Sequence, residues 1–213
     1  MTAVKSLLLR CALAIWFGWL SLPVASAAAA APVILVLGDS LSAGYGVSVD
    51  ATWVALLQQR LAKQGYGYRV VNASVSGETT GGARARLPRA LELHQPALVV
   101  IELGGNDGLR GLPLKQVRAN FEAMLSQAQA AGARAVLVAM RIPTNYGPAY
   151  TTAFHAIYGE LGQKYSVPVI DGFMESVALD DALMQADGIH PNAKAQPVLL
   201  DVIWPTVSRQ LKK

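Results

Sequence analysis

Residues 33–46 read VILVLGDSLSAGYG. The first five, VILVL, form a wholly apolar run that stops at a glycine and an aspartate. The run is short, rich in β-branched residues and apolar at every position, which is typical of a strand buried on both faces. Such strands belong to parallel sheets that helices cover on both sides. Gly38, Asp39 and Ser40 come directly after this run. We therefore expect them at the carboxyl end of a strand, where open α/β sheets bind their ligands.

Short apolar runs alternate with helical periodicity along the rest of the chain. Further strands are expected at residues 68–73, 97–103, 133–140 and 167–170. Apolar spacing predicts helices at residues 52–64, in the latter part of 79–94, and at 114–131, 148–165 and 197–211. This alternation predicts an α/β protein: a three-layer α/β/α domain around a five-stranded parallel sheet.

The first 27 residues have the three parts of a secretory signal peptide. Lys5 and Arg10 supply a basic start, residues 11–22 form an apolar run, and residues 25–27 (ASA) fit the small-x-small cleavage pattern. The run is shorter than the roughly 20 residues that a membrane-spanning helix needs, so we expect no stable membrane anchor. The alternative is that this segment is retained as an anchor. We expect an exported protein, periplasmic or secreted, in which residues 28–213 form a single domain.

Removing the signal peptide changes the composition of the mature chain. It takes away Cys11, the only cysteine, and with it any disulfide, thiolate nucleophile or cysteine-bound metal. The formal charge falls from +4 to +2, which is too little to indicate nucleic-acid binding. The one local basic cluster, Arg84, Arg86 and Arg89, is better explained as a solvated helix face. We expect a monomer that binds a small molecule.

Three other segments carry unusual polar sequences at informative places. NASVSGETT (72–80) follows the second predicted strand, ELGGNDG (102–108) follows the third, and DGIHP (187–191) precedes the last predicted helix. Each has an ordinary explanation when taken alone, as a helix N-cap or a turn. Together with GDSLSAGYG, they make four such segments in one order, three of them at strand ends, which structural roles alone hardly explain.

In this order the four segments resemble the four blocks of the GDSL or SGNH hydrolases. NYGPAY (145–150), AIYGEL (156–161) and FMESV (173–177) resemble the bacterial periplasmic branch of thioesterase I, lysophospholipase and arylesterase. The resemblance covers essentially all of the mature chain. It implies a flavodoxin-like fold and a serine hydrolase that cleaves carboxylic esters and thioesters through an acyl-enzyme intermediate.

The residue types of these blocks suit nucleophilic catalysis. A serine hydroxyl is a weak nucleophile unless a base takes its proton, and Ser40 is the candidate nucleophile. His190 is the candidate base, because a neutral imidazole has one acceptor nitrogen. Asp187 would accept a hydrogen bond from the other ring nitrogen of His190 and stabilise the imidazolium.

Other residues of the same types fit these roles less well. His94 is predicted at a helix end and His155 inside a helix away from the four blocks, so both are interpreted as surface or packing residues. Asp180 and Asp181 lie near Asp187 in the sequence and are the fallback acids.

The resemblance also implies an oxyanion hole with three donors. These are the backbone N–H of Ser40, the backbone N–H of Gly77 and the side-chain amide of Asn106. A residue without Cβ at position 77 lets substrate approach the backbone, and an asparagine offers N–H donors without charge. Each donor follows a different strand, so the three can converge.

Three acidic residues near the blocks raise the alternative of a metal site. Asp39, Glu102 and Asp107 flank the predicted site, but their spacing with His190 matches no metal-binding motif. Asp39 and Asp107 are better interpreted as acceptors for loop amides. We expect no metal and no cofactor.

An acyl substrate needs apolar surface beside the nucleophile. GLRGLPL (108–114) and RIPTNYGPAY (141–150) follow the third and fourth strands, and their residues Leu109, Leu112 and Tyr146 are the candidate substrate contacts. Packing into the core is an equal alternative for both leucines. An exported enzyme seldom meets cytosolic acyl-CoA, so lysophospholipids or free esters are the expected natural substrates. A carbohydrate esterase, an acyltransferase and a non-catalytic lipid-binding module remain as alternatives.

Overall fold

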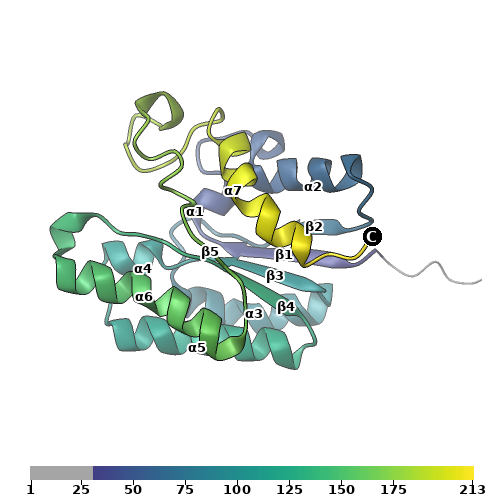
Figure 1. Ribbon diagram of the computed structural model, residues 1–213, viewed down its shortest axis with the longest axis horizontal. Coiled ribbons are helices and arrows are strands. Elements are labelled where there is room, and N and C mark those ends of the chain that lie inside the picture. Colours follow the sequence, from purple (N-terminus) through teal and green to yellow (C-terminus); the bar gives the residue numbers. More distant parts are fainter. Residues whose placement is uncertain (1–30) are drawn as a thin grey trace, which may run out of the picture. The chain divides into compact units, whose positions relative to one another are not determined.

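A computed structural model describes residues 31–213, which form one compact unit. The predicted signal peptide, residues 1–27, lies outside the described residues. One parallel sheet has the strand order β2-β1-β3-β4-β5 (Figure 1). The strand bounds are β1 Val33–Gly38, β2 Arg69–Asn72, β3 Leu98–Glu102, β4 Arg134–Val138 and β5 Val169–Ile170. The predicted five-stranded parallel sheet is confirmed, with every strand at its predicted place.

Long helices cover both faces of this sheet. On one face, α2 (Trp53–Lys63) packs against α7 (Gln196–Arg209). On the other face lie α3 (Thr80–His94), α5 (Leu114–Ala130) and α6 (Pro148–Tyr165), with α5 in contact with both neighbours (Figure 1). The three-layer α/β/α arrangement is therefore confirmed. None of the helices in residues 31–213 is long and apolar enough to cross a membrane.

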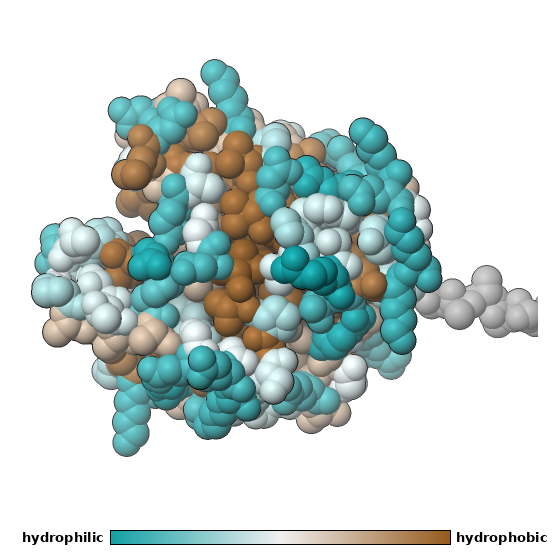
Figure 2. Space-filling view, in the orientation of Figure 1, coloured by the Kyte–Doolittle hydropathy of each residue, from teal (hydrophilic) through white to brown (hydrophobic). Residues whose placement is uncertain are grey.

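The core lies between these layers. Its largest fully buried side chains are Trp53, Phe121, Phe154, Tyr158 and Phe173. Every residue of β1 and β3 is buried, as expected for inner strands of a covered parallel sheet. Figure 2 shows hydrophobic residues gathered in a band across the middle of the face that carries β5 between α6 and α7. This edge strand has only two residues, a length that discourages pairing with other chains.

Two short helices that the periodicity did not predict begin just beyond the inner strands. They are α1 (Ser40–Ala43), after β1, and α4 (Gly105–Leu109), after β3. The turn into α1 is tight: a Cβ at Gly38 would lie 2.6 Å from the Ser42 hydroxyl oxygen and 2.7 Å from a Glu102 carboxyl oxygen. Only glycine fits there. The 3₁₀ turns η1 (Val49–Ala51), η2 (Thr144–Tyr146) and η3 (Asp181–Leu183) lie in the connecting loops.

Candidate active site

Ser40 lies in the first turn of α1, two residues beyond the end of β1. Asp39 caps this helix, because its Oδ1 accepts a hydrogen bond from the backbone N–H of Leu41 at 3.0 Å. Asp39 is therefore the N-cap of α1, and Ser40 is its first helical residue. An aspartate one residue earlier satisfies the free amide, and the Ser40 hydroxyl remains available for other contacts.

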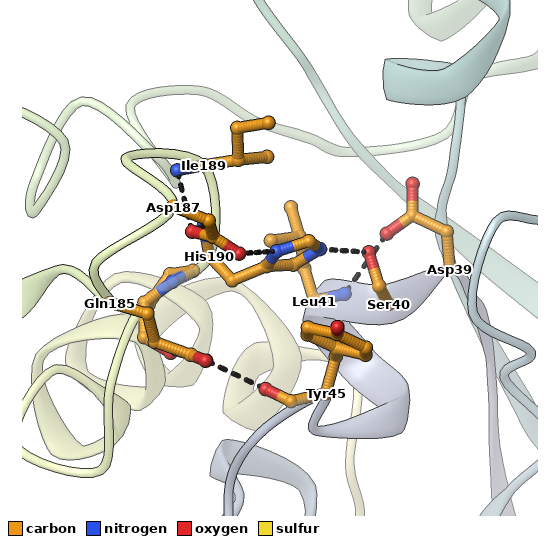
Figure 3. A network of polar contacts seen from close by, with 9 residues as sticks. Asp39, Ser40, Leu41, Tyr45, Gln185, Asp187, Ile189 and His190 are labelled. Atoms are coloured by element: carbon orange, nitrogen blue, oxygen red, sulfur yellow. Dashed lines mark hydrogen bonds and ion pairs between the residues drawn. The ribbon is translucent and has the colours of Figure 1, made fainter.

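The three residues predicted as a triad come together in one chain of hydrogen bonds (Figure 3). His190 Nε2 lies 2.9 Å from Ser40 Oγ, across 150 residues of sequence. His190 Nδ1 lies 2.7 Å from Asp187 Oδ2. An ionised carboxylate only accepts, so Nδ1 carries the proton and Nε2 accepts from the serine hydroxyl. This tautomer is the one in which a histidine can deprotonate a serine.

Asp187 holds its own loop as well as the imidazole. Its Oδ1 accepts hydrogen bonds from the backbone N–H groups of Ile189, at 2.9 Å, and of His190, at 3.0 Å. The backbone and side-chain hydrogen bonds from His190, followed by that from Ile189, lower the pKa of Asp187 from 3.8 to about 2. The carboxylate is therefore ionised wherever the imidazole needs a negative partner.

Tyr45 and Gln185 support His190, and the sequence patterns did not predict either of them. The Tyr45 ring lies against the imidazole, with centroids 4.5 Å apart. The Gln185 side-chain amide donates to the Tyr45 carbonyl at 2.7 Å (Figure 3). The Gln185 backbone N–H donates to the His190 carbonyl at 2.7 Å. Gln185 thus ties the histidine loop to the segment that follows α1.

Gly77 lies in the turn between β2 and α3 and has a φ of +77°, a conformation that favours glycine. A Cβ there would meet only one side-chain atom within 4 Å, a guanidinium nitrogen of Arg110 at 3.9 Å. That guanidinium donates to the Gly77 carbonyl at 3.0 Å. The space beside the Gly77 backbone is open on this side, as expected for a residue that substrate approaches.

Asn106 and Asp107, in α4, are linked to the other two loops of the site. The Asn106 side-chain amide donates to Asp39 Oδ2 at 3.1 Å, next to Ser40. The buried Asp107 carboxylate accepts from Thr80, at 2.9 Å from its backbone N–H and 2.6 Å from its hydroxyl. Asp39 and Asp107 do accept from loop amides, as predicted. The structure therefore links the loops carrying Ser40, Gly77 and Asn106.

Two buried carboxyl groups, those of Asp39 and Glu102, make hydrogen bonds to α1. Burial raises the pKa of Asp39 from 3.8 to about 6. Burial and then the charge of Asp39 raise the pKa of Glu102 well above its usual 4.5, although the Ser42 hydroxyl lies 2.6 Å from its Oε2. Burial thus favours the neutral form of both carboxyls, and the charge of Asp39 adds to this effect at Glu102.

Glu102→Gln is expected to change how the stability of the protein depends on pH. Because the pKa of Glu102 is higher in the folded than in the unfolded chain, the folded chain keeps its proton as pH rises above 4.5. Between the two pKa values this carboxyl lowers the free energy of unfolding by about 1.4 kcal/mol per pH unit. Glutamine lacks this titration, so the variant should gain stability relative to the parent as pH rises. Urea unfolding of both proteins at pH 5 and pH 7 gives the free energy of unfolding of the variant minus that of the parent. If this difference is the same or smaller at pH 7, the pKa of Glu102 is not raised.

The candidate substrate contacts are Leu109 at the end of α4, Leu112 in the loop after α4, and Tyr146 in η2. Leu109 and Tyr146 are exposed, and the Tyr146 hydroxyl donates to the Leu109 carbonyl at 2.6 Å. Leu112 packs partly against the core, and the Tyr150 hydroxyl donates to its carbonyl at 2.8 Å. A separate hollow of about 310 Å³ is lined by residues between 178 and 188, in the segment that leads up to and includes Asp187. Its lining residues are Ala178, Asp181, Met184, Gln185, Ala186 and Gly188.

Two of the residues set aside on sequence grounds, His155 and Asp180, have other partners in the structure. His94 ends α3, and His155, in α6, lies 3.4 Å from a carboxylate oxygen of Asp171. Asp180 caps η3 by accepting from the backbone N–H of Ala182 at 2.9 Å. In the part of the chain that the structure describes, no group of three or more His, Cys, Asp or Glu residues is arranged to hold a metal ion.

Known proteins resemble this chain along most of its length. The sequence profile of the GDSL-like lipase/acylhydrolase family matches residues 36–196. The esterase TesA of Pseudomonas aeruginosa is 50% identical over 190 residues, which cover 89% of this chain and 94% of that protein. Thioesterase 1/protease 1/lysophospholipase L1 of Escherichia coli K12 is 48% identical over 174 residues, 82% of each chain. A crystal structure of TesA matches with a TM-score of 0.82 and 50% identity, covering 84% of this chain and 99% of that one.

The fold and these relatives define a hydrolase of the esterase and thioesterase class. The chain belongs to the GDSL-like lipase/acylhydrolase family. The resemblance drawn from the four sequence blocks is thereby confirmed.

Proposed function

We propose that this chain hydrolyses carboxylic esters and thioesters through an acyl-enzyme intermediate on Ser40. The supporting observation is the hydrogen-bonded chain from Asp187 through His190 to Ser40, beside the carboxyl end of β1. The names of the relatives, an esterase and a thioesterase with lysophospholipase activity, support the same chemistry. They favour it over a carbohydrate esterase, an acyltransferase or a non-catalytic lipid-binding module.

The reaction proceeds in two halves. Ser40 Oγ attacks the substrate carbonyl carbon while His190 Nε2, 2.9 Å away, takes the hydroxyl proton. The imidazolium gives this proton to the leaving alcohol or thiol as the bond to the acyl group breaks. A water molecule then attacks the carbonyl carbon of the acyl-enzyme while His190 takes a proton from the water. His190 gives this proton to Ser40 Oγ as the bond between Ser40 and the acyl group breaks, and the carboxylic acid is released. Asp187 remains ionised throughout and stabilises the imidazolium.

Each half passes through a tetrahedral intermediate whose oxyanion needs donors. The proposed donors are the backbone N–H groups of Ser40 and Gly77 and the side-chain amide of Asn106. The links from Asn106 to Asp39 and from Arg110 to Gly77 hold these donors before substrate arrives. Donors fixed in advance stabilise developing charge without the cost of reorganisation.

Asn106→Ala is expected to lower kcat by about 10²–10³-fold and to leave KM nearly unchanged, because the lost hydrogen bond forms mainly in the transition state. Steady-state kinetics on p-nitrophenyl butyrate measure both constants. A large rise in KM with an unchanged kcat would assign Asn106 to substrate binding instead.

The rim of the site suits an acyl chain. Eight large hydrophobic side chains are exposed among residues 31–213. Five of them lie on segments that carry or adjoin the site: Tyr45, Val75, Leu109, Tyr146 and Ile189. We infer that Leu109 and Tyr146 contact the acyl chain directly, with Leu112 behind them.

We further propose that residues 1–27 are removed on export and that residues 28–213 act as a monomer in the periplasm or outside the cell. In that location, lysophospholipids and free esters are the expected substrates.

Assays of the mature chain on p-nitrophenyl butyrate, an acyl thioester, a lysophospholipid and an acetylated sugar test the proposed ester and thioester hydrolysis. Turnover of the first two is expected, and turnover of the sugar alone would contradict it.

A further inference from the structure

The Asp39 carboxylate makes a contact that the triad does not require. Its Oδ1 already satisfies the cap of α1 by accepting from Leu41. Its Oδ2 accepts from the side-chain amide of Asn106 at 3.1 Å, across 67 residues of sequence. Asp39 is only 2% exposed, so this second contact is shielded from water.

We propose that Asp39 is a positioning residue that keeps the NH₂ end of the Asn106 amide as the end that serves the oxyanion. This inference rests on the proposed ester hydrolysis and on the proposed role of Asn106 in it.

The proposal follows from the near symmetry of a carboxamide. The two ends of an asparagine amide have almost the same shape, and rotation by 180° exchanges a pair of donors for an acceptor. An oxyanion needs donors, and a carbonyl oxygen in the same place would repel it. An ionised carboxylate accepts only, so Asp39 selects the NH₂ end of Asn106. One N–H bonds to Asp39, and the amide keeps a second N–H for the oxyanion.

Asp39 carries this selection without help from other side chains. Within residues 31–213, the Asn106 side chain makes no other hydrogen bond to the protein. Oδ2 lies close to the start of α4, since a Cβ at Gly105 would approach it to 3.4 Å. Burial raises the pKa of Asp39 to about 6, and the carboxylate is therefore ionised at pH 8. The charges of His190 and Asp107 act on Asp39, and Asp39 in turn acts on the buried Glu102 and Tyr158.

Two substitutions separate positioning from a merely structural role. Asp39→Asn is isosteric: its Oδ1 still caps Leu41, but its NH₂ group faces the NH₂ group of Asn106. The Asn106 amide is then expected to rotate, which restores a local hydrogen bond and turns its carbonyl oxygen toward the oxyanion. Asp39→Ser keeps a good N-cap, lacks the second oxygen and leaves the amide free to adopt either orientation.

The experiment compares kcat and KM for p-nitrophenyl butyrate at pH 8 in the parent chain, Asp39→Asn, Asp39→Ser, Asn106→Ala and Asp39→Asn/Asn106→Ala. Asp39→Asn should lower kcat by about 10²–10³-fold, like the loss of one oxyanion donor, and leave KM and the thermal midpoint almost unchanged. Asp39→Ser should lower kcat less than Asp39→Asn does. The double variant should be no slower than Asn106→Ala, because the amide that Asp39 orients is already absent.

Three results would overturn the inference. One is a kcat for Asp39→Asn within about threefold of the parent value. Another is a kcat for the isosteric Asp39→Asn above that of Asp39→Ser, which is the order that packing alone predicts. The third is a double variant in which the two losses multiply, since an effect independent of Asn106 is structural.

If Asp39→Asn fails to fold, a parent-like kcat in Asp39→Ser overturns the inference. A parent chain without any turnover would instead overturn the proposed function, and the inference with it.

Discussion

Replacing His190 with alanine is expected to lower kcat for p-nitrophenyl butyrate by about 10⁶-fold, because the serine and its base act as one unit. The imidazole Nε2 is 2.9 Å from the Ser40 hydroxyl oxygen. Asp187 reaches only Nδ1 on the opposite side of the ring. Without the imidazole, the hydroxyl has no base in position and remains a weak nucleophile. Substrate binding depends on the rim of the site, so KM should change little.

His94→Ala is the matched control for this substitution. His94 is the last residue of α3, at the opposite end of the helix from Thr80 and its bonds to Asp107. Its loss is expected to leave kcat within about threefold of the parent value, as for most surface substitutions. A His190→Ala variant that kept a hundredth or more of the parent kcat would show that His190 is not the base.

Asp187→Asn is expected to lower kcat by about 10⁴-fold with little loss of stability. The two oxygens of Asp187 have separate tasks: Oδ1 accepts from the amides of Ile189 and His190, and Oδ2 accepts from the imidazole. In the variant, the remaining carbonyl oxygen keeps the loop in place, and the new NH₂ group faces His190 Nδ1. The imidazole must then accept at Nδ1 and carry its proton at Nε2, so it no longer takes the proton from Ser40.

The neighbouring acid provides the control. Asp180 caps η3 and makes no hydrogen bond to the imidazole. Asp180→Asn keeps a capping oxygen, and kcat should stay within about threefold of the parent value. A loss in Asp180→Asn as large as in Asp187→Asn would mean that the fallback acid has been wrongly set aside. The Asp187→Asn variant should unfold at nearly the parent urea concentration, which separates the tautomer effect from loop collapse.

The sheet was predictable because its strands carry a strong local signal. Residues 33–37 and 98–101 are apolar at every position, which strands buried on both faces require.

The start of α3 was harder to predict, because Gly81 and Gly82 each disfavour the helix by about 1 kcal/mol. The structure begins this helix at Thr80, with a side-chain cap from Thr79 and the bonds from Thr80 to Asp107.

The short helices were not predictable from periodicity. α1 has four residues and α4 has five, too few for a repeat of apolar positions to appear. The serines of α1 and the glycines, asparagine and aspartate of α4 favour caps and turns when judged locally. Contacts distant in sequence hold them instead, above all the bond from Asn106 to Asp39.

The supporting residues of the site show the same limit. The four blocks located Ser40, Asp187 and His190, and the structure brings their side chains together. Tyr45 and Gln185 gave no such signal, because their bond joins residues 140 positions apart and a single sequence does not reveal that pairing. Contacts of this kind depend on how the loops meet after the sheet has formed.

The most direct test of the proposed mechanism is the mass of the protein after reaction with a fluorophosphonate, which forms a stable adduct with an activated serine. The intact parent chain should gain one adduct per molecule, located by peptide mapping on Ser40, and lose its turnover of p-nitrophenyl butyrate in proportion. Ser40→Ala should gain no adduct and show no turnover. An adduct on another residue, or a Ser40→Ala variant that still hydrolyses the ester, would contradict the account of Ser40 as the nucleophile.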